Sequence, residues 1–385
     1  MDIKTKERSY RISPEELKEL KFAGIRKNFE HHYTNNLLYR MYCELLAKHG
    51  IGRNVTPDDI KTYEDLYKIP LIPSDFFKEL SRIGKERLLI TRGVEASIYF
   101  TTSGTTGTQT KYFFDRESLK EINEENVFTC RDILEVNDND AVIFLTPPIE
   151  KSRTGLIRGG YMMFREIVGD DNIYFLYQEE IEENPSELLE NLVGKIRDKC
   201  QGRIHLYGPP FVYYEIVEEL RNKGKRIEID GNAMTTGGWK RWVGGEIPKE
   251  KLYEGIDERL GIPEKKIRDG LGLTDIFMWC PECEYHEKHV PLGVHVSVRN
   301  PEEFTAPVEP GEEGLLSFMS PYIKSYPAYV VTGDIGVETV SVDEYCKCGR
   351  VGNAVAHKRR AKGTQPRGCA LVLEELLKKM ENERI

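Results

Sequence analysis

The stretch from Thr101 to Lys111 limits the possible folds more than any other part of this chain. It reads Thr-Thr-Ser-Gly-Thr-Thr-Gly-Thr-Gln-Thr-Lys and contains no large apolar side chain. Aromatic and branched residues flank it at 98–100 and 112–114, which predicts a polar loop between two strands. Glycine lets a ligand approach the backbone closely, and successive amides and hydroxyls can form a concavity suited to a phosphate. An ordinary Ser/Thr/Gly linker remains the alternative on composition alone.

Length and charge exclude several classes of protein. The chain has 385 residues, enough for one large α/β domain with appendages or for two domains. The net charge of -9 gives no basic footprint for nucleic acid, and Lys358-Arg359-Arg360 is interpreted as a solvated turn or a phosphate contact. No apolar run reaches membrane-spanning length and the start lacks a signal-peptide core, so we expect a cytoplasmic protein without a membrane span. Its eight cysteines are then expected to be thiols or metal ligands rather than disulfides.

Helix and strand patterns alternate through the middle of the chain. Apolar runs predict strands at 141–145, 203–207 and 226–229, and the spacing of apolar residues predicts helices from Asn184, at 211–223 and at 248–260. This βαβα order predicts an α/β fold in which helices cover parallel sheets. The N-terminal part is expected to be helical, with Ser13 as a helix cap and with His31 and His32 at the surface. Beyond Gly293, short strands and turns predict a smaller β-rich region.

The segment Ser103-Gly104-Thr105-Thr106-Gly107 resembles the phosphate loop of adenylate-forming enzymes, such as acyl-CoA synthetases and firefly-type luciferases. A Walker loop fits less well, because no lysine follows either glycine. The resemblance implies that this segment and Thr102 bind ATP, and that Thr106 and Lys111 take part in catalysis. The usual lysine would fall at Thr110. Its displacement to Lys111 is similar to the phenylacetate-CoA ligase and acyl-protein synthetase branches.

Two further motifs resemble nucleotide-binding segments of the same superfamily. Gly237 and Gly238, within Thr-Thr-Gly-Gly-Trp-Lys, resemble the stretch that lies against adenine, although a plain strand-to-helix turn has the same composition. Leu271-Gly272-Leu273-Thr274-Asp275 resembles Tyr-Gly-x-Thr-Glu, which implies that Thr274 contacts the α-phosphate and that Asp275 binds Mg²⁺. An aspartate is one methylene shorter than the usual glutamate and still suits a hard cation.

The segment Thr332-Gly333-Asp334 matches the Thr-Gly-Asp of the superfamily, whose aspartate accepts hydrogen bonds from the ribose hydroxyls. Arg350 occupies the place of an arginine near the ribose and the hinge between domains. The four motifs occur in the expected order between Ser103 and Arg350, which is far less probable by chance than any one of them. The resemblance therefore implies a nucleotide site with Asp334 at its ribose end.

Two close pairs of cysteines predict a metal site. Cys280 and Cys283 form a CxxC pair, and Cys346 and Cys348 form a CxC pair. Four thiolates in two such pairs suit a closed tetrahedral zinc site with a structural role. Three nearby histidines could replace one ligand: His286, His289 and His295. Ordinary surface thiols are the alternative, because CxC is a less usual spacing than CxxC.

Cys369 is a candidate acyl acceptor. Arg367-Gly368-Cys369 precedes an amphipathic helical pattern, and a cysteine at a helix N-terminus beside an arginine has more thiolate character. A small residue packed at the start of a helix is the alternative. Few residues follow Arg350, whereas CoA ligases of the superfamily carry a C-terminal domain there. In this respect the chain resembles the acyl-protein synthetases (LuxE type), which pass a fatty acyl group from acyl-AMP to their own C-terminal cysteine and then to a reductase partner.

These observations and the resemblance together predict how the chain is divided and what the protein does. We expect an adenylate-forming α/β fold with a helical segment at 1–70, a nucleotide- and acyl-binding core at 71–292, a β-rich subdomain at 293–350 and a truncated C-terminal segment at 351–385. The expected function is ATP- and Mg²⁺-dependent activation of a carboxylic acid, with a fatty acid as the first candidate, and transfer of the acyl group to a thiol. An aryl-acid CoA ligase of the phenylacetate kind and a noncatalytic, zinc-stabilised nucleotide-binding module are the alternatives.

Overall fold

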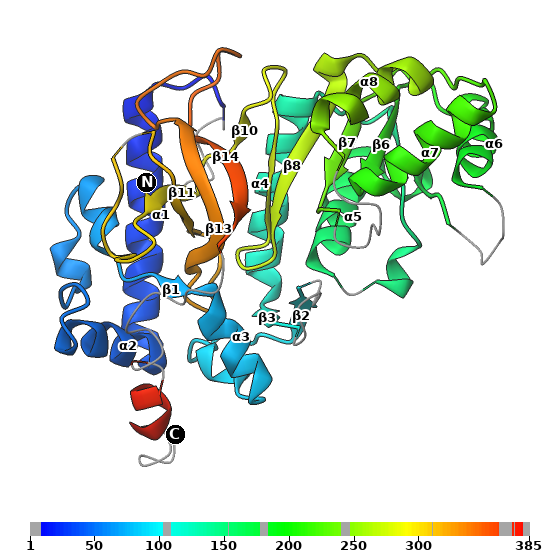
Figure 1. Ribbon diagram of the computed structural model, residues 1–385. Helices are drawn as coiled ribbons and strands as arrows, with labels where there is room; N and C mark the ends of the chain where they lie inside the picture. Colours follow the sequence, from blue (N-terminus) through cyan, green and yellow to red (C-terminus); the bar gives the residue numbers. More distant parts are fainter. Residues whose placement is uncertain are drawn as a thin grey trace. The chain divides into compact units, whose positions relative to one another are not determined.

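The computed structural model describes residues 9–102, 109–152, 154–177, 184–239, 247–309, 311–361, 372 and 374–379 (Figure 1). It forms two compact units. Unit 1 comprises residues 1–125, 274–277 and 289–385, and unit 2 comprises residues 126–273 and 278–288. The four-part division expected from the sequence remains a prediction. No helix within the described ranges combines the length and the apolar character that a bilayer crossing requires.

Unit 2 contains a six-stranded sheet in the order β5-β4-β6-β7-β8-β9. Every neighbouring pair from β5 to β8 is parallel, and only β9 runs antiparallel to β8. The strands are β4 (Ala141–Phe144), β5 (Ile173–Phe175), β6 (Ile204–Gly208), β7 (Ala233–Thr236), β8 (Ile267–Leu273) and β9 (Met278–Pro281). The connecting helices are α5 (Gly155–Val168), α6 (Pro185–Arg197), α7 (Pro210–Asn222) and α8 (Lys249–Leu260). The predicted parallel sheet with alternating helices is thus confirmed.

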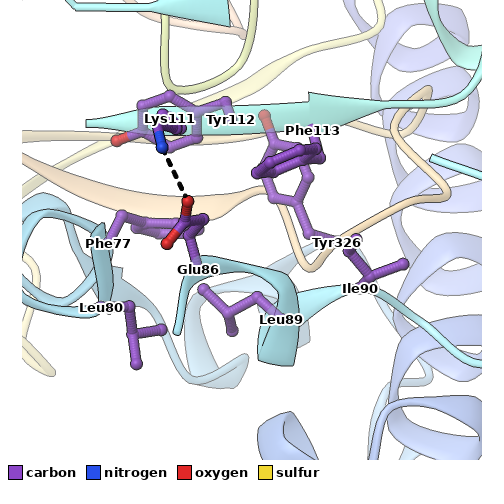
Figure 2. Close-up of a pocket in the computed structure, with 9 residues that line it drawn as sticks. All are labelled: Phe77, Leu80, Glu86, Leu89, Ile90, Lys111, Tyr112, Phe113 and Tyr326. Carbon is purple, nitrogen blue, oxygen red and sulfur yellow. Dashed lines mark hydrogen bonds and ion pairs between the residues drawn. The ribbon is translucent and has the colours of Figure 1, made fainter. Parts of the chain in front are cut away.

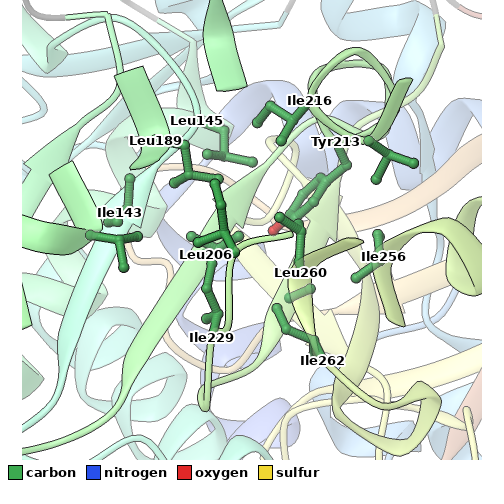
Figure 3. Close-up of a cluster of buried hydrophobic side chains, with 14 of the residues drawn as sticks. Ile143, Leu145, Leu189, Leu206, Tyr213, Ile216, Ile229, Ile256, Leu260 and Ile262 are labelled. Carbon is green, nitrogen blue, oxygen red and sulfur yellow. The ribbon is translucent and has the colours of Figure 1, made fainter. Parts of the chain in front are cut away.

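The core of unit 2 is almost entirely aliphatic (Figure 3). All four residues of β4 are buried, which is why its sequence is a continuous apolar run rather than an alternating one. Leu189 of α6, Ile216 of α7 and Ile256 of α8 are fully buried in the same cluster. Burial of each such side chain stabilises the fold by roughly 1.5–3 kcal/mol. The helices are therefore held to the sheet mainly by the hydrophobic effect.

The strand predicted at 226–229 is wrong. Its alternation of Arg226 and Glu228 with the buried Ile227 and Ile229 imitates a strand pattern. The amides of both isoleucines instead donate to backbone carbonyls at the end of α8, at 2.9 Å each. The next strand of the sheet, β7, begins only at Ala233.

Unit 1 is built on a mixed sheet in the order β10-β14-β13-β12-β11, with β1 parallel to β13. The strands are β1 (Ile72–Pro73), β10 (Lys288–His289), β11 (His295–Arg299), β12 (Gly314–Met319), β13 (Tyr329–Val340) and β14 (Ala354–Arg360). The pairs from β11 to β14 are antiparallel. The β-rich region predicted beyond Gly293 is confirmed.

Unit 1 contains several helices, of which the first begins after Ser13 as the sequence predicts. They are α1 (Pro14–Asn35), α2 (Leu37–Lys48) and α3 (Ser74–Arg82), and α4 (Arg116–Leu134) crosses the boundary into unit 2. Ser13 caps α1 in a reciprocal capping box with Glu16. His32 is fully buried, so its expected surface position is wrong. Its two ring nitrogens contact the hydroxyl of Thr91 and the carbonyl of Ile323 at 2.9 Å each, and burial lowers its pKa to about 3. These two partners, distant in sequence, are what the sequence could not reveal.

Candidate active site

The polar stretch is carried by a two-stranded hairpin, as predicted. β2 (Ile98–Thr101) pairs antiparallel with β3 (Lys111–Phe114). The base of the loop is closed by two hydrogen bonds. The Thr102 amide donates to the carbonyl of Thr110, and the Thr110 amide donates to the hydroxyl of Thr102, at 3.1 Å each. The predicted phosphate-loop residues Ser103, Gly104, Thr105, Thr106 and Gly107 lie outside the described residues.

The Thr274–Phe277 turn packs against this hairpin. Phe277 adopts a positive φ of 49°, which is uncommon for a residue with a bulky side chain. Its ring stacks on Phe100 of β2 with centroids 4.4 Å apart, and it also contacts Phe114 of β3 at 5.3 Å. The hydroxyl of Tyr326 donates to the backbone carbonyl of Asp275 at 2.8 Å. Aromatic packing thus holds the Thr274–Phe277 turn against the two strands that flank the polar stretch.

The carboxylate of Asp275 is held by hydroxyl groups. Ser74, the first residue of α3, donates its hydroxyl to Oδ2 of Asp275 at 2.9 Å. The buried hydroxyl of Tyr112 on β3 also bonds to this carboxylate. Burial raises the pKa of Asp275, while these two hydrogen bonds act in the opposite direction. Among the described residues, no lysine or arginine forms an ion pair with Asp275. Its hydrogen-bond partners are neutral hydroxyls, and the charge of Arg360 also lowers its pKa without a direct contact.

A hard divalent cation fits this arrangement. A partly buried carboxylate without an ion-pair partner gains from a bound cation, and Mg²⁺ prefers one or two carboxylates together with substrate phosphates. Asp275 could therefore hold Mg²⁺ beside the hairpin. Thr274, the neighbouring predicted phosphate ligand, is also partly exposed.

The carboxylate of Asp334 is held by a guanidinium and an imidazole instead. Oδ1 of Asp334 lies 3.1 Å from Nε of Arg360 and 3.1 Å from Nε2 of His357. Both partners come from β14, whose register opposes Asp334 to Arg360. A Cβ atom at Gly333 would approach the guanidinium of Arg360 to 3.3 Å, so the glycine of the Thr-Gly-Asp motif leaves room for this pair. The Asp334 amide donates to the hydroxyl of Thr332 at 3.1 Å, which fixes the strand locally.

Lys111 lies on the face of β3 opposite to Tyr112, the residue that bonds to the carboxylate of Asp275. Side chains alternate along β3, so Lys111 and the buried Tyr112 lie on opposite faces. Nζ of Lys111 forms an ion pair with Oε1 of Glu86 at 3.1 Å, at the edge of a small pocket lined mainly by apolar side chains (Figure 2). The lysine is held by a carboxylate rather than by the Asp275 turn.

The predicted adenine segment belongs to unit 2. Gly237 and Gly238 are exposed and follow β7 directly, at the carboxyl end of the parallel strands. Ligands of open α/β sheets bind at this end. Gly237 has a φ of 77°, which side chains rarely tolerate. Another pocket, lined in part by Cys200 and Ile204, lies in unit 2 at the amino end of β6. Because ligands of such sheets bind at the carboxyl ends of the strands, this pocket is not favoured as the nucleotide site.

The predicted metal-ligating thiols come from two segments of the chain, and the structure groups Cys283 with Cys346 and Cys348. Cys280 lies on β9 opposite Leu271, and Cys283 follows in the next turn, both in unit 2. Cys346 and Cys348 lie in unit 1, in the same turn as the buried Arg350. Of the three histidines proposed as substitutes, His286 pairs with Glu282 and His295 contacts Tyr63. The remaining one, His289, lies 3.4 Å from Sγ of Cys348.

Sequence reasoning missed four residues that shape the site: Ser74, Tyr112, His357 and Arg360. Ser74 follows the Pro70–Pro73 segment, and its position beside Asp275 depends on the pairing of β1 with β13. Arg360 belongs to the basic cluster interpreted as a solvated turn or a phosphate contact, whereas it lies on β14 and pairs with Asp334. Only the strand register, which the sequence does not state, places these side chains on the two carboxylates.

Comparison with known proteins gives consistent matches. A family model described as acyl-protein synthetase, LuxE, matches residues 2–378. The long-chain-fatty-acid–luciferin-component ligase of Aliivibrio fischeri is 26% identical over 373 residues, covering 95% of this chain and 90% of that protein. The ligase of the same name from Vibrio harveyi is 25% identical over 367 residues, covering 94% and 89%.

Solved structures of ligases share the fold. A 2-hydroxyisobutyryl-CoA ligase in complex with 2-HIB-AMP and CoA has a TM-score of 0.66 at 14% identity, covering 89% of this chain and 69% of that chain. A long-chain-fatty-acid-CoA ligase from Archaeoglobus fulgidus has a TM-score of 0.50 at 16% identity, covering 74% and 54%. At this identity the likeness concerns the fold alone, and it confirms the predicted α/β class.

Proposed function

Because the chain belongs to the acyl-protein synthetase (LuxE) family, we propose that it activates a fatty acid as acyl-AMP and passes the acyl group to its own Cys369. The family and its named ligase relatives make the chain an AMP-forming acid ligase that activates its substrate by adenylation. The fatty chain follows from the relatives' names, which specify long-chain fatty acids. The observation that carries the proposal is Asp275, a carboxylate balanced by hydroxyls and packed against the hairpin of the polar loop.

In the first step, a carboxylate oxygen of the acid attacks the α-phosphorus of ATP. A bond forms between that oxygen and phosphorus, and the bond to the β-phosphate breaks, so that pyrophosphate leaves. We assign pyrophosphate to the loop 103–107 and the α-phosphate to Thr274. Mg²⁺ on Asp275 would offset the negative charge of the phosphates. Thr102, at the closed base of the loop, keeps its two ends together.

The nucleoside end has its own residues in this proposal. Asp334 accepts hydrogen bonds from the two ribose hydroxyls, with His357 and Arg360 fixing its carboxylate from one side. Arg350 lies near the ribose, and the exposed backbone of Gly237 and Gly238 lies against adenine. A carboxylate held by charged donors keeps its remaining lone pairs in a fixed direction, which suits recognition of two vicinal hydroxyls.

Lys111 and Thr106 act on the phosphates in this proposal. Lys111 would have to exchange its ion pair with Glu86 for a phosphate oxygen when ATP binds. The Lys111 side chain is 43% exposed and that of Glu86 is 11% exposed. The lysine can therefore be reached by a phosphate that takes the place of the glutamate.

In the second step, the thiolate of Cys369 attacks the acyl carbonyl carbon, a thioester forms and AMP leaves. Cys369 lies outside the described residues, but helical residues 374–379 follow it closely. Leu376 is fully buried, and Glu375 bonds to Lys48 at 2.8 Å and to His49 at 2.7 Å on α2 and just after it. Residues 374–379 are thus tied to the α2 region of unit 1. A protein partner, such as a reductase, or CoA would then take the acyl group.

One experiment tests this function. The protein is incubated with ATP, Mg²⁺ and a long-chain fatty acid without CoA, and its intact mass is measured. We expect a gain of one acyl group that hydroxylamine removes, since hydroxylamine cleaves thioesters. Cys369→Ser should lose the acyl group while retaining fatty-acid-dependent ATP–pyrophosphate exchange. Cys200→Ser, at a partly exposed cysteine of unit 2, is the matched control and should behave as the wild type.

Two results would contradict the transfer step. If acyl product forms only when CoA is added, the acyl acceptor is CoA and not Cys369. Full acylation of Cys369→Ser would assign the thioester to another residue. Failure of the exchange reaction with every acid in a broad panel would overturn the adenylation step itself.

A further inference from the structure

His289, Cys346 and Cys348 gather in unit 1. Each offers one ligand atom, and these atoms lie within 4.8 Å of one another. Sγ of Cys348 is 3.4 Å from Nε2 of His289. Two ligands of one tetrahedral zinc ion, with bonds of about 2.0 and 2.3 Å, stand roughly 3.5 Å apart. The spacing of the thiol and the imidazole therefore already matches a shared ion.

The two thiols are set by a tight turn. The backbone closes through a bridge between Tyr345 and Val351. Within it the Cys346 amide donates to the carbonyl of Arg350, and the Gly349 amide donates to the carbonyl of Cys346, at 2.8 Å each. Gly349 has a φ of 79°, so the turn needs a residue without a side chain at this point. The CxC spacing, unusual for a metal pair, is explained by this turn.

The histidine is fixed from a second segment. His289 forms the end of β10, and the amide of the next residue, Val290, donates to the carbonyl of Asn353 at 2.9 Å. Its ring meets Tyr10 edge-on at 6.0 Å and is fully buried. Among the described residues, Nδ1 of His289 has no hydrogen-bond partner, and Nε2 contacts Sγ of Cys348.

The cluster lies largely out of water. Cys346 is 4% exposed and His289 is 0% exposed. Placing polar or charged groups out of water costs free energy unless they are paired or bind a metal. Thiolate sulfur and imidazole nitrogen are the ligands that zinc prefers over Mg²⁺ or Ca²⁺.

We propose that His289, Cys346 and Cys348 bind a structural zinc ion. A closed structural site needs a fourth ligand. Cys283 is the first candidate, since only five residues separate it from His289 in the chain, and Cys280 is the second. The ion fastens the end of β10 to the 345–351 turn. Because Arg350 belongs to that turn, the ion also fixes the backbone of a residue assigned to the nucleotide site.

The test measures metal rather than activity. The full-length protein is purified from medium supplemented with zinc, and its metal content is determined by plasma mass spectrometry. We expect about one zinc ion per chain, released in full by a thiol-reactive mercurial and detected with a chromogenic chelator. Replacement by Co²⁺ should give the visible absorption bands of tetrahedral cobalt with thiolate ligands. A strong chelator should lower the melting temperature of the wild type, because a structural ion stabilises only the folded state.

Variants assign the ligands. Cys346→Ser, Cys348→Ser and His289→Ala should each lower the zinc content at least about fivefold in protein that remains soluble. Cys200→Ser is the matched control and should keep its zinc. Loss of zinc in Cys283→Ser and retention in Cys280→Ser would confirm Cys283 as the fourth ligand.

Three results would overturn the proposal. A wild-type protein that contains less than about 0.1 zinc per chain and does not take up Co²⁺ has no such site. Retention of zinc in both Cys346→Ser and Cys348→Ser would place the ion elsewhere. A disulfide between Cys346 and Cys348 in freshly purified protein would show that these residues form a redox pair and do not bind a metal. The wild-type measurements decide the question even if a variant fails to fold.

Discussion

Two carboxylates of unit 1, Asp275 and Asp334, stand in opposite electrostatic settings. Asp275 is bound by the neutral hydroxyls of Ser74 and Tyr112, and burial raises its pKa. Asp334 is bound at 3.1 Å by the guanidinium of Arg360 and by the imidazole of His357. The two settings also interact, because the charge of Arg360 lowers the pKa of Asp275 and the charge of Asp334 raises it.

The different partners of Asp275 and Asp334 indicate which kind of ligand each carboxylate can bind. A carboxylate with only hydroxyl partners retains an unbalanced charge, so a divalent cation stabilises it. A carboxylate that is already paired with a guanidinium gains less from a further cation, and its free lone pairs suit neutral hydroxyls. We therefore assign the phosphate and Mg²⁺ end of ATP to Asp275 and the ribose end to Asp334, and four predictions test this contrast.

The largest effect is expected for Asp275→Asn. The rate of fatty-acid-dependent ATP–pyrophosphate exchange should fall roughly 100-fold or more, because the carboxylate that holds the cation is lost. Stability should move in the other direction. A carboxyl whose pKa is raised on folding contributes stability below its unfolded pKa and loses it as pH rises through the folded pKa, so at neutral pH the charge is a cost.

Urea unfolding at pH 7 measures the second half of that prediction. Asp275→Asn should be at least as stable as the wild type, since the amide oxygen can still accept from Ser74. A variant that loses both activity and stability would show that Asp275 is a structural residue.

The next largest effect is expected for Asp334→Asn. Loss of charge-assisted hydrogen bonds to the ribose should raise the KM for ATP roughly 10- to 100-fold, with a smaller change in kcat. In contrast to Asp275→Asn, this variant should be less stable than the wild type, because the ion pair with Arg360 is removed. Steady-state kinetics with ATP and with 2′-deoxy-ATP check the assignment. A wild-type enzyme that discriminates against the deoxynucleotide as weakly as the variant does would refute the ribose role.

A smaller effect with a defined pH dependence is expected for Ser74→Ala. The hydroxyl of Ser74 lowers the pKa of Asp275, so its removal should raise that pKa further. A cation binds only to ionised Asp275. When the medium is acidified, the exchange rate of the variant should therefore begin to fall at a higher pH than that of the wild type. At neutral pH we expect only about a fivefold loss.

The pH–rate profile of exchange from pH 5 to 8 gives this measurement. Ser341→Ala, in the loop after β13, is the control and should keep the wild-type profile. An unchanged acid limb in Ser74→Ala would show that this hydrogen bond does not tune Asp275.

The smallest effect is expected for His357→Gln. His357 is about one-third exposed and shares Asp334 with Arg360, so its loss should raise the KM for ATP only about two- to fivefold. His31→Gln, at a partly exposed histidine of α1, is the matched control. An effect of His357→Gln as large as that of Asp334→Asn would mean that His357 itself contacts the nucleotide.

The sequence predicts the fold and the order of the motifs well because both depend on local patterns. The buried run at 141–145, the capping box at Ser13 and the strands that flank the polar loop all follow from residues close together in the chain. The failure at 226–229 arises because alternation shows that a segment is half-buried but does not name its hydrogen-bond partner.

The partners of the site residues depend on long-range register and could not be predicted. Ser74 reaches Asp275 across 201 positions, and Arg360 reaches Asp334 only because β14 returns beside β13. In the same way, the CxxC and CxC spacings predict a thiol site, whereas the contact of His289 with Cys348 follows from the fold alone.

The central contrast is tested most directly by a Mg²⁺ titration of ATP–pyrophosphate exchange with a long-chain fatty acid in three proteins: the wild type, Asp275→Asn and Asp334→Asn. We predict that Asp275→Asn requires far more Mg²⁺ for half-maximal exchange, while Asp334→Asn keeps the wild-type Mg²⁺ requirement and shows a raised KM for ATP. The opposite assignment of the two effects, or equal Mg²⁺ requirements in all three proteins, would contradict the account.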